Sequence, residues 1–98
     1  MSFRVVFRRM AKRDFADAIS WYEGRREGLG QEFSLAVEQR LERIAASPHQ
    51  FAPIRGKIRR AVLRRFPYSI FFLAEDRRIV VLAVFHAKRD PQHLENRF

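Results

Sequence analysis

The longest apolar run of this chain is Ile79-Val80-Val81-Leu82-Ala83-Val84-Phe85. It is rich in β-branched residues, contains no charge, and is far too short to cross a bilayer. An uninterrupted run of this kind is typical of a central strand that is covered on both faces. We therefore predict a β-sheet in which residues 79–85 form an interior strand.

Three further segments have strand character. Residues 58–65 mix arginines with apolar side chains, and after Pro67 an aromatic-rich segment runs from 68 to 73. The polar residues 74–77 then turn the chain into the apolar run. Because strands joined by short links pair most simply with their neighbours, these segments are predicted to form a meander. The sequence Phe-Arg-Val-Val-Phe at residues 3–7 predicts one more strand.

Two amphipathic helices are predicted between the first strand and the other three. Their apolar residues recur at spacings of three and four, namely Phe15, Ala18, Ile19 and Tyr22 within 11–27, and Phe33, Val37, Leu41 and Ile44 within 31–46. Gly28-Leu29-Gly30 separates the helices, and Ser47-Pro48 ends the second one. The predicted fold class is α+β in the order β-α-α-β-β-β. A two-helix antiparallel hairpin packs on one face of a small, mainly antiparallel sheet, and residues 87–98 form a polar tail.

The composition limits what such a chain can be. Its 98 residues allow one hydrophobic core, so we predict a single domain over residues 1–98. The absence of cysteine excludes disulfides, thiolate metal sites and a cysteine nucleophile. Arginines interrupt the N-terminal residues where a secretory signal would need an apolar segment. We therefore expect a cytoplasmic protein with no membrane partner.

Positive charge is the strongest feature of the composition. Lys and Arg number 20 against 11 Asp and Glu, which gives a net charge of +9. Such a surface attracts nucleic acid, an acidic protein or an anionic membrane, and a generically basic domain would have it too. No acidic residue occurs between Arg43 and Ala74, where six cations gather: Arg55, Lys57, Arg59, Arg60, Arg64 and Arg65. We interpret them as a strand that presents arginines to phosphate or carboxylate groups. The alternative is a sheet edge protected from aggregation by charge.

A second polar cluster, residues 86–91, follows directly after the apolar run. His86 can shuttle a proton and Arg89 can stabilise charge that develops on phosphate, the two roles that a metal-free ribonuclease needs. The alternative is that His86 packs under the tail while Arg89 pairs with Asp90 or a helix carboxylate. Trp21-Tyr22 is interpreted as core packing rather than base stacking. The histidines lack ligand spacing and no Gly-rich phosphate loop is present, so we expect neither a metal nor a cofactor.

Several motifs follow one another along almost the whole chain. They are Trp21-Tyr22-Glu23, Gly28-Leu29-Gly30, Phe33, Ser47-Pro48, Arg-Arg-Phe-Pro-Tyr-Ser-Ile-Phe-Phe at 64–72 and Val-Phe-His-Ala-Lys-Arg-Asp-Pro at 84–91. In this order they resemble toxins of the RelE/ParE family of type II toxin–antitoxin systems. The Phe-Pro-Tyr turn and the final His-x-x-Arg-Asp-Pro run are most like the ParE branch. The resemblance implies two helices against a small antiparallel sheet, and an acidic antitoxin that holds the toxin inactive.

The family resemblance also implies a choice between two targets. RelE-like members cut messenger RNA on the ribosome, whereas ParE-like members poison DNA gyrase, an activity associated with plasmid stabilisation. Where RelE-like toxins place an arginine after the tyrosine of the third strand, this chain has Ser69 after Tyr68, and it lacks their late tyrosine. Arg89 matches an arginine of the RelE-like set, and Arg60 takes the place of one of its lysines. The resemblance therefore favours gyrase binding, with ribosome-dependent RNA cleavage and a non-toxic basic binding module as alternatives.

The residues expected to bind the target or the antitoxin are Arg59, Arg60, Arg64, Arg65, Tyr68, Lys88 and Arg89. If the protein is a nuclease, the expected catalytic residues are Arg60, His86 and Arg89. The expected partners are an acidic antitoxin and DNA gyrase, or the ribosome with messenger RNA in place of gyrase.

Overall fold

The computed structural model describes residues 2–97, and within them the chain builds a five-stranded sheet in the order β1-β5-β4-β3-β2. The strands are β1 (Arg4–Phe7), β2 (Pro53–Arg55), β3 (Ile58–Val62), β4 (Tyr68–Glu75) and β5 (Arg78–His86). β1 pairs with β5 in parallel, and all other pairs are antiparallel. The apolar run therefore lies inside the sheet, between β1 and β4. The predicted meander of β3, β4 and β5 is confirmed.

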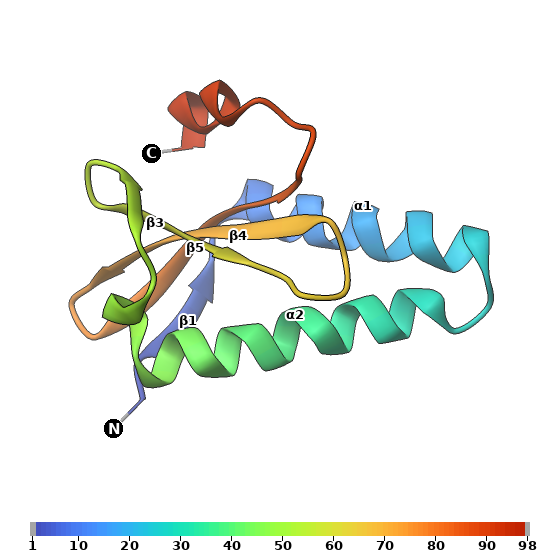
Figure 1. Cartoon of the computed structure of the whole chain (residues 1–98), viewed down its shortest axis with the longest axis horizontal. Helices are drawn as coiled ribbons and strands as arrows, with labels where there is room; N and C mark the ends of the chain where they lie inside the picture. Colours follow the sequence, from blue (N-terminus) through green and yellow to red (C-terminus); the bar gives the residue numbers. More distant parts are fainter. Residues whose placement is uncertain (1, 98) are drawn as a thin grey trace.

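Two helices, α1 (Arg9–Arg25) and α2 (Leu29–Ala46), form the predicted antiparallel hairpin (Figure 1). Their apolar stripes and one face of the sheet enclose the larger core cluster. Its centre is aromatic, because the rings of Tyr22, Phe33, Phe66 and Tyr68 lie with centroids 5.0 to 6.0 Å apart. No helix within residues 2–97 has the length and apolar composition that a membrane span requires.

The link between the helices depends on its glycines. Gly28 has a φ of 88°, in the left-handed region that glycine adopts without strain. The backbone N–H groups of Gly28 and Gly30 each donate to the Glu23 carboxylate at 2.9 Å, so a side chain of α1 caps the start of α2. A Cβ atom on Gly30 would lie 2.6 Å from the carbonyl oxygen of Ile19. Only glycine lets the two helices approach this closely.

The sequence prediction was wrong in three segments. Residues 48–56, for which the sequence predicts only a loop between the second helix and the strand at 58–65, contain the 3₁₀ helix η1 (Pro48–Gln50) and the edge strand β2. The strand expected over 58–65 ends at Val62. Most of the expected polar tail is a 3₁₀ helix, η2 (Pro91–Arg97), in which Leu94 is fully buried. Leu94 packs on a second apolar cluster on the sheet face opposite the helical hairpin, and this burial orders the tail. Phe98 lies outside the described residues.

A β-bulge interrupts the pairing of β5 with β4. Phe71 pairs with Ala83 and Phe72 pairs with Val81, so Leu82 is an extra residue on β5. β1 pairs with β5 only up to Val81 within residues 2–97. The bulge therefore falls where β5 loses its neighbour on one side, and its backbone groups need other partners.

A buried ion pair supplies these partners. The backbone N–H of Val84 donates to Asp14 Oδ2 at 3.0 Å, and Arg97 Nη1 donates to the carbonyl oxygen of Leu82 at 3.0 Å. Arg97 Nη1 lies 2.7 Å from Asp14 Oδ2, and only 3% of the Arg97 side chain and 9% of the Asp14 side chain is exposed. One pair thus joins α1, the bulge of β5 and η2.

Candidate functional site

A pocket of about 400 Å³ opens where β4 and β5 meet the side of α1. It is lined by Asp14, Asp17, Ala18 and Trp21 of α1 and by Tyr68, Val84, Phe85, His86 and Arg89. Tyr68 and His86 lie opposite each other in the β4–β5 ladder, with ring centroids 5.2 Å apart. The sheet register therefore brings Tyr68, His86 and Arg89 together, three residues that the sequence analysis had selected.

The α1 side of this pocket was not foreseen. Tyr22 is buried, as predicted, but 52% of Trp21 is exposed and its side chain lines the pocket. The guanidinium carbon of Arg25 lies 4.3 Å from the centroid of the Trp21 ring. Asp17 and Trp21 are four residues apart, a spacing that places them on the same helix face. This four-residue spacing is the feature of the sequence from which the shared position of Asp17 and Trp21 could have been predicted.

His86 is half-buried and its ring orientation is fixed by the turn that follows β5. Its Nδ1 accepts a hydrogen bond from the backbone N–H of Lys88 at 3.0 Å. The neutral ring therefore carries its proton on Nε2. The turn itself is held by the Arg89 N–H, which donates to the His86 carbonyl at 2.9 Å, and by the Ala87 N–H, which donates to the Pro67 carbonyl at 2.7 Å.

Arg89 presents an exposed positive charge beside His86. Its guanidinium carbon lies 4.2 Å from the centroid of the Phe85 ring, and its Nε donates to Nδ1 of His93 at 3.3 Å. Among residues 2–97 no carboxylate pairs with Arg89. This charge can therefore meet an anionic group of a partner.

Tyr68 is held more firmly than the other two residues, since its ring belongs to the aromatic core. Burial raises the pKa of its hydroxyl, and the neighbouring Tyr22 and Asp14 raise it further. The hydroxyl therefore stays protonated at neutral pH and is available as a hydrogen-bond donor. Within the described residues no group of three or more His, Asp or Glu side chains is arranged to hold a metal ion.

The other predicted residues lie outside this pocket. Arg59 Nη1 donates to the carbonyl oxygen of Phe51 at 2.6 Å, so it anchors the segment between η1 and β2. Arg60 is exposed on β3 opposite Phe71 and does not line the His86 pocket. Lys88 is exposed in the turn after β5 and does not line the pocket either.

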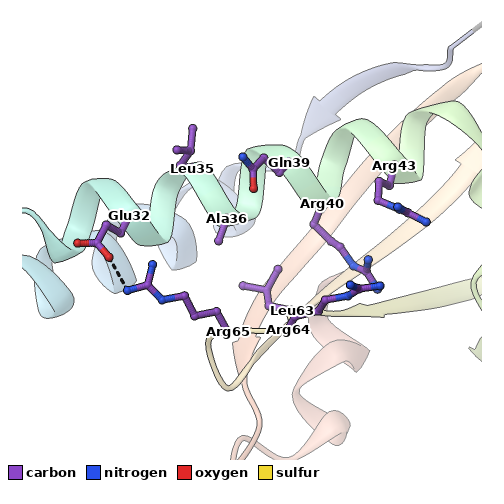
Figure 2. A pocket seen from close by; sticks show the side chains of 9 residues that line it. All are labelled: Glu32, Leu35, Ala36, Gln39, Arg40, Arg43, Leu63, Arg64 and Arg65. Carbon is purple, nitrogen blue, oxygen red and sulfur yellow. Dashed lines mark hydrogen bonds and ion pairs between the residues drawn. The ribbon is translucent and has the colours of Figure 1, made fainter.

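Arg64 and Arg65 lie in a second site, a groove between α2 and the loop after β3. Its volume is about 340 Å³ (Figure 2), and its lining residues are Glu32, Leu35, Ala36, Gln39, Arg40, Arg43, Leu63, Arg64 and Arg65. Arg65 hydrogen-bonds to Glu32. Burial lowers the pKa of Arg40, and the positive charges of Arg64 and Arg43 lower it further. Arg40 and Arg43 were not among the predicted site residues, although their three-residue spacing puts both on one face of α2.

Comparisons with known proteins bear on the family and on the fold. The sequence profile of the family described as "ParE toxin of type II toxin-antitoxin system, parDE" matches residues 5–91. Toxin ParE2 of Mycobacterium tuberculosis is 30% identical over 83 residues, which cover 84% of this chain and 79% of that protein.

Two solved structures share the fold. A chain of the chromosomal ParDE system from P. aeruginosa matches with a TM-score of 0.70 at 15% identity, covering 87% of this chain and 96% of that one. A chain of the RelBE2 toxin-antitoxin complex from Mycobacterium tuberculosis matches with a TM-score of 0.63 at 20% identity, covering 88% and 99%. Because the family profile spans most of the sequence, the chain belongs to the ParE toxin family of type II toxin–antitoxin systems.

Proposed function

We propose that this toxin arrests growth in the cytoplasm by binding DNA gyrase, and that a cognate acidic antitoxin neutralises it. The observation that carries the proposal is the match of the ParE toxin profile to residues 5–91. The net charge of +9 suits an acidic antitoxin, because opposite charges steer the two proteins together.

The distribution of the candidate residues favours binding over RNA cleavage. A metal-free nuclease must move protons and stabilise phosphate charge within one site. His86 and Arg89 share a pocket, but Arg60, the third residue of the expected catalytic set, does not line it. The raised pKa of Tyr68 makes its hydroxyl a weaker proton donor. Ser69, which stands where RelE-like toxins have an arginine, has only 9% of its surface exposed and therefore does not replace that arginine.

The experiment that tests the proposal is inducible expression followed by separate assays of DNA replication and translation. We expect replication to stop first, and the purified toxin to inhibit DNA supercoiling by purified gyrase. Co-expression of the protein encoded by the adjacent gene is expected to restore growth. Normal growth at verified expression of the folded protein would contradict toxicity.

Ribosome-dependent RNA cleavage is the second candidate, supported by the shared pocket of His86 and Arg89. It predicts cuts in ribosome-bound messenger RNA while gyrase stays fully active. Primer extension on messenger RNA from induced cells distinguishes the two candidates, since gyrase binding leaves the transcripts intact.

A further inference from the structure

The His86 pocket carries one unpaired charge of each sign. Asp17 on α1 and Arg89 in the turn after β5 both line it, and both are exposed. Among residues 2–97 neither side chain has an ion-pair partner. Asp14, which also lines the pocket, is already neutralised by Arg97. The two free charges of the lining therefore cancel, although the chain as a whole is strongly basic.

The strand side of the pocket is suited to a carboxylate. The Arg89 guanidinium lies over the Phe85 ring, and its Nε donates to His93, so its Nη groups remain for a ligand. His86 presents an Nε2–H donor, since its Nδ1 already accepts a hydrogen bond. The Tyr68 hydroxyl is a further donor of the same lining. A carboxylate accepts hydrogen bonds from such a set, and the bond to a guanidinium is the strongest of them.

The α1 side of the pocket is suited to an ammonium group with an apolar neighbour. The Asp17 carboxylate is a charged acceptor, and Trp21 lies one helical turn further along the same face. Trp21 is 52% exposed, so its indole offers an apolar surface on which a side chain can pack. Ala18, which also lines the pocket, is small and leaves room beside the indole.

The charge and the size of the pocket disfavour a nucleic-acid strand. Such a strand needs several cations along its phosphates, whereas Arg89 is the one Lys or Arg among the described residues that line the pocket. Asp17 would in addition repel a phosphate group. The volume of about 400 Å³ lies within the range of roughly 300 to 1,000 Å³ that is typical of small-molecule sites. A small molecule with both charges and an apolar group fits these conditions.

We propose that this pocket binds a small zwitterion with an apolar side chain, either a free amino acid or a short peptide. Its carboxylate pairs with Arg89 and His86, its ammonium group pairs with Asp17, and its side chain packs against Trp21. The binding site is independent of the proposed function. One consequence does rest on that function: because Arg89 is expected to meet the target, an occupied pocket competes with target binding.

The test uses the full chain and its own fluorescence, because Trp21 is the only tryptophan. The probes are L-phenylalanine and glycyl-phenylalanine, together with N-acetyl-phenylalanine and phenylalanine amide, which each lack one charge. We expect a saturable fluorescence change with a zwitterion and binding at least about tenfold weaker for both blocked compounds, since each loses a charged hydrogen bond. The tighter of the two zwitterions shows whether the site takes an amino acid or a peptide.

Three results of this titration would overturn the proposal. They are the absence of saturable binding by either zwitterion, equal affinities for the zwitterionic and blocked compounds, and tighter binding of adenosine monophosphate than of both zwitterions. The last result would assign the pocket to an anionic ligand instead.

Variants of the two charged residues test the orientation of the ligand. Asp17→Asn is expected to weaken zwitterion binding by about tenfold and to leave N-acetyl-phenylalanine unaffected, because that compound has no ammonium group. Arg89→Gln is expected to weaken zwitterion binding similarly and to leave phenylalanine amide unaffected. The control is Arg13→Gln, which removes an exposed arginine of α1 outside the pocket. Equal weakening of all compounds by Asp17→Asn would contradict this orientation.

The positions of these variants are exposed, so the fold is expected to tolerate them, and thermal denaturation checks this. The titration needs neither gyrase nor growth, so the two proposals fail separately. If the chain arrests growth and inhibits gyrase but no zwitterion binds, the pocket proposal fails and the toxin function stands. If a zwitterion binds as described but the chain does not arrest growth, the pocket proposal stands and the proposed function fails.

Discussion

Asp14 and Arg97 come from opposite ends of the chain and meet in its interior, 2.7 Å apart. Only 9% and 3% of the two side chains is exposed, so removal of one charge leaves the other without a partner away from water. Arg97→Met is therefore expected to lower the free energy of unfolding by about 3 kcal/mol. Urea denaturation followed by circular dichroism measures this change.

A second ion pair provides the matched control. Arg55 and Glu95 also join η2 to the rest of the molecule, at 2.6 Å, but 48% and 57% of their side chains is exposed. Because exposed pairs are screened by water, Glu95→Gln is expected to change the free energy of unfolding by less than about 0.5 kcal/mol. An equal loss in the Glu95 and Arg97 variants would show that attachment of η2, rather than burial of charge, sets the effect.

His86 and Arg89 line one pocket, yet the two mechanisms give them different importance. If the toxin acts by binding, His86→Gln is expected to leave growth arrest largely intact, whereas Arg89→Glu abolishes it by reversing a charge. A nuclease that loses its general acid or base slows by about 100- to 10,000-fold, so His86→Gln would then abolish growth arrest too. Colony counts after induction, at matched soluble expression, measure the difference. Equal loss of toxicity in both variants would favour cleavage.

Glu32 connects helix α2 to the loop between β3 and β4. Its hydrogen bond with Arg65, more than any other contact, lowers the pKa of this carboxyl below its ordinary value of 4.5. A carboxyl with a depressed folded-state pKa stabilises the fold above its unfolded-state pKa, and this contribution is lost as pH falls through the folded-state value. Glu32→Gln is therefore expected to be slightly less stable than the parent at pH 7.

The pH dependence provides the decisive comparison for Glu32. The difference between the parent and Glu32→Gln is expected to shrink as pH falls below 4.5, because both side chains are then uncharged. Urea midpoints over a pH series measure it, with Glu38→Gln on the exposed side of α2 as the control. A difference that persists at low pH would mean that Glu32 acts through packing rather than through its charge.

Helices and strands were predictable where one periodicity dominated. The apolar stripes of α1 and α2 and the apolar run at 79–85 were sufficient to predict these two helices and the central strand, because each buries a continuous apolar face. η2 was not predictable, since its single buried apolar residue, Leu94, has no periodic partner and its burial depends on the far face of the sheet. The bulge at Leu82 is set by pairing between strands and has no local sequence signal.

Site residues were predictable as residue types but not as neighbours. The sequence selected Arg59, Arg60, Arg64 and Arg65 as one stripe, but β3 ends at Val62 and the stripe divides. Arg64 instead lines the same groove as Arg40, an arrangement that depends on how α2 packs against the loop. Tyr68 and His86 were selected separately, and the register of β4 with β5 makes them neighbours.

The whole molecule carries a net charge of +9, and its electric field acts on a partner before any contact forms. We expect the rate constant for association with the proposed acidic antitoxin to fall about tenfold or more between low and high ionic strength. The dissociation rate constant is expected to change much less, because it depends on contacts that are already formed. Stopped-flow fluorescence at a series of salt concentrations measures both constants.

The contributions of the net charge and of the groove to antitoxin binding can be separated with two single variants. Arg13→Gln and Arg40→Gln each remove one positive charge, so each should slow association slightly and to a similar degree. Only Arg40 lines the groove, so only Arg40→Gln is expected to accelerate dissociation. An association rate that does not respond to salt would remove the role of net charge. Equal dissociation rates for the two variants would instead mean that the antitoxin does not bind through Arg40, and that the groove contributes to attraction only as part of the total charge.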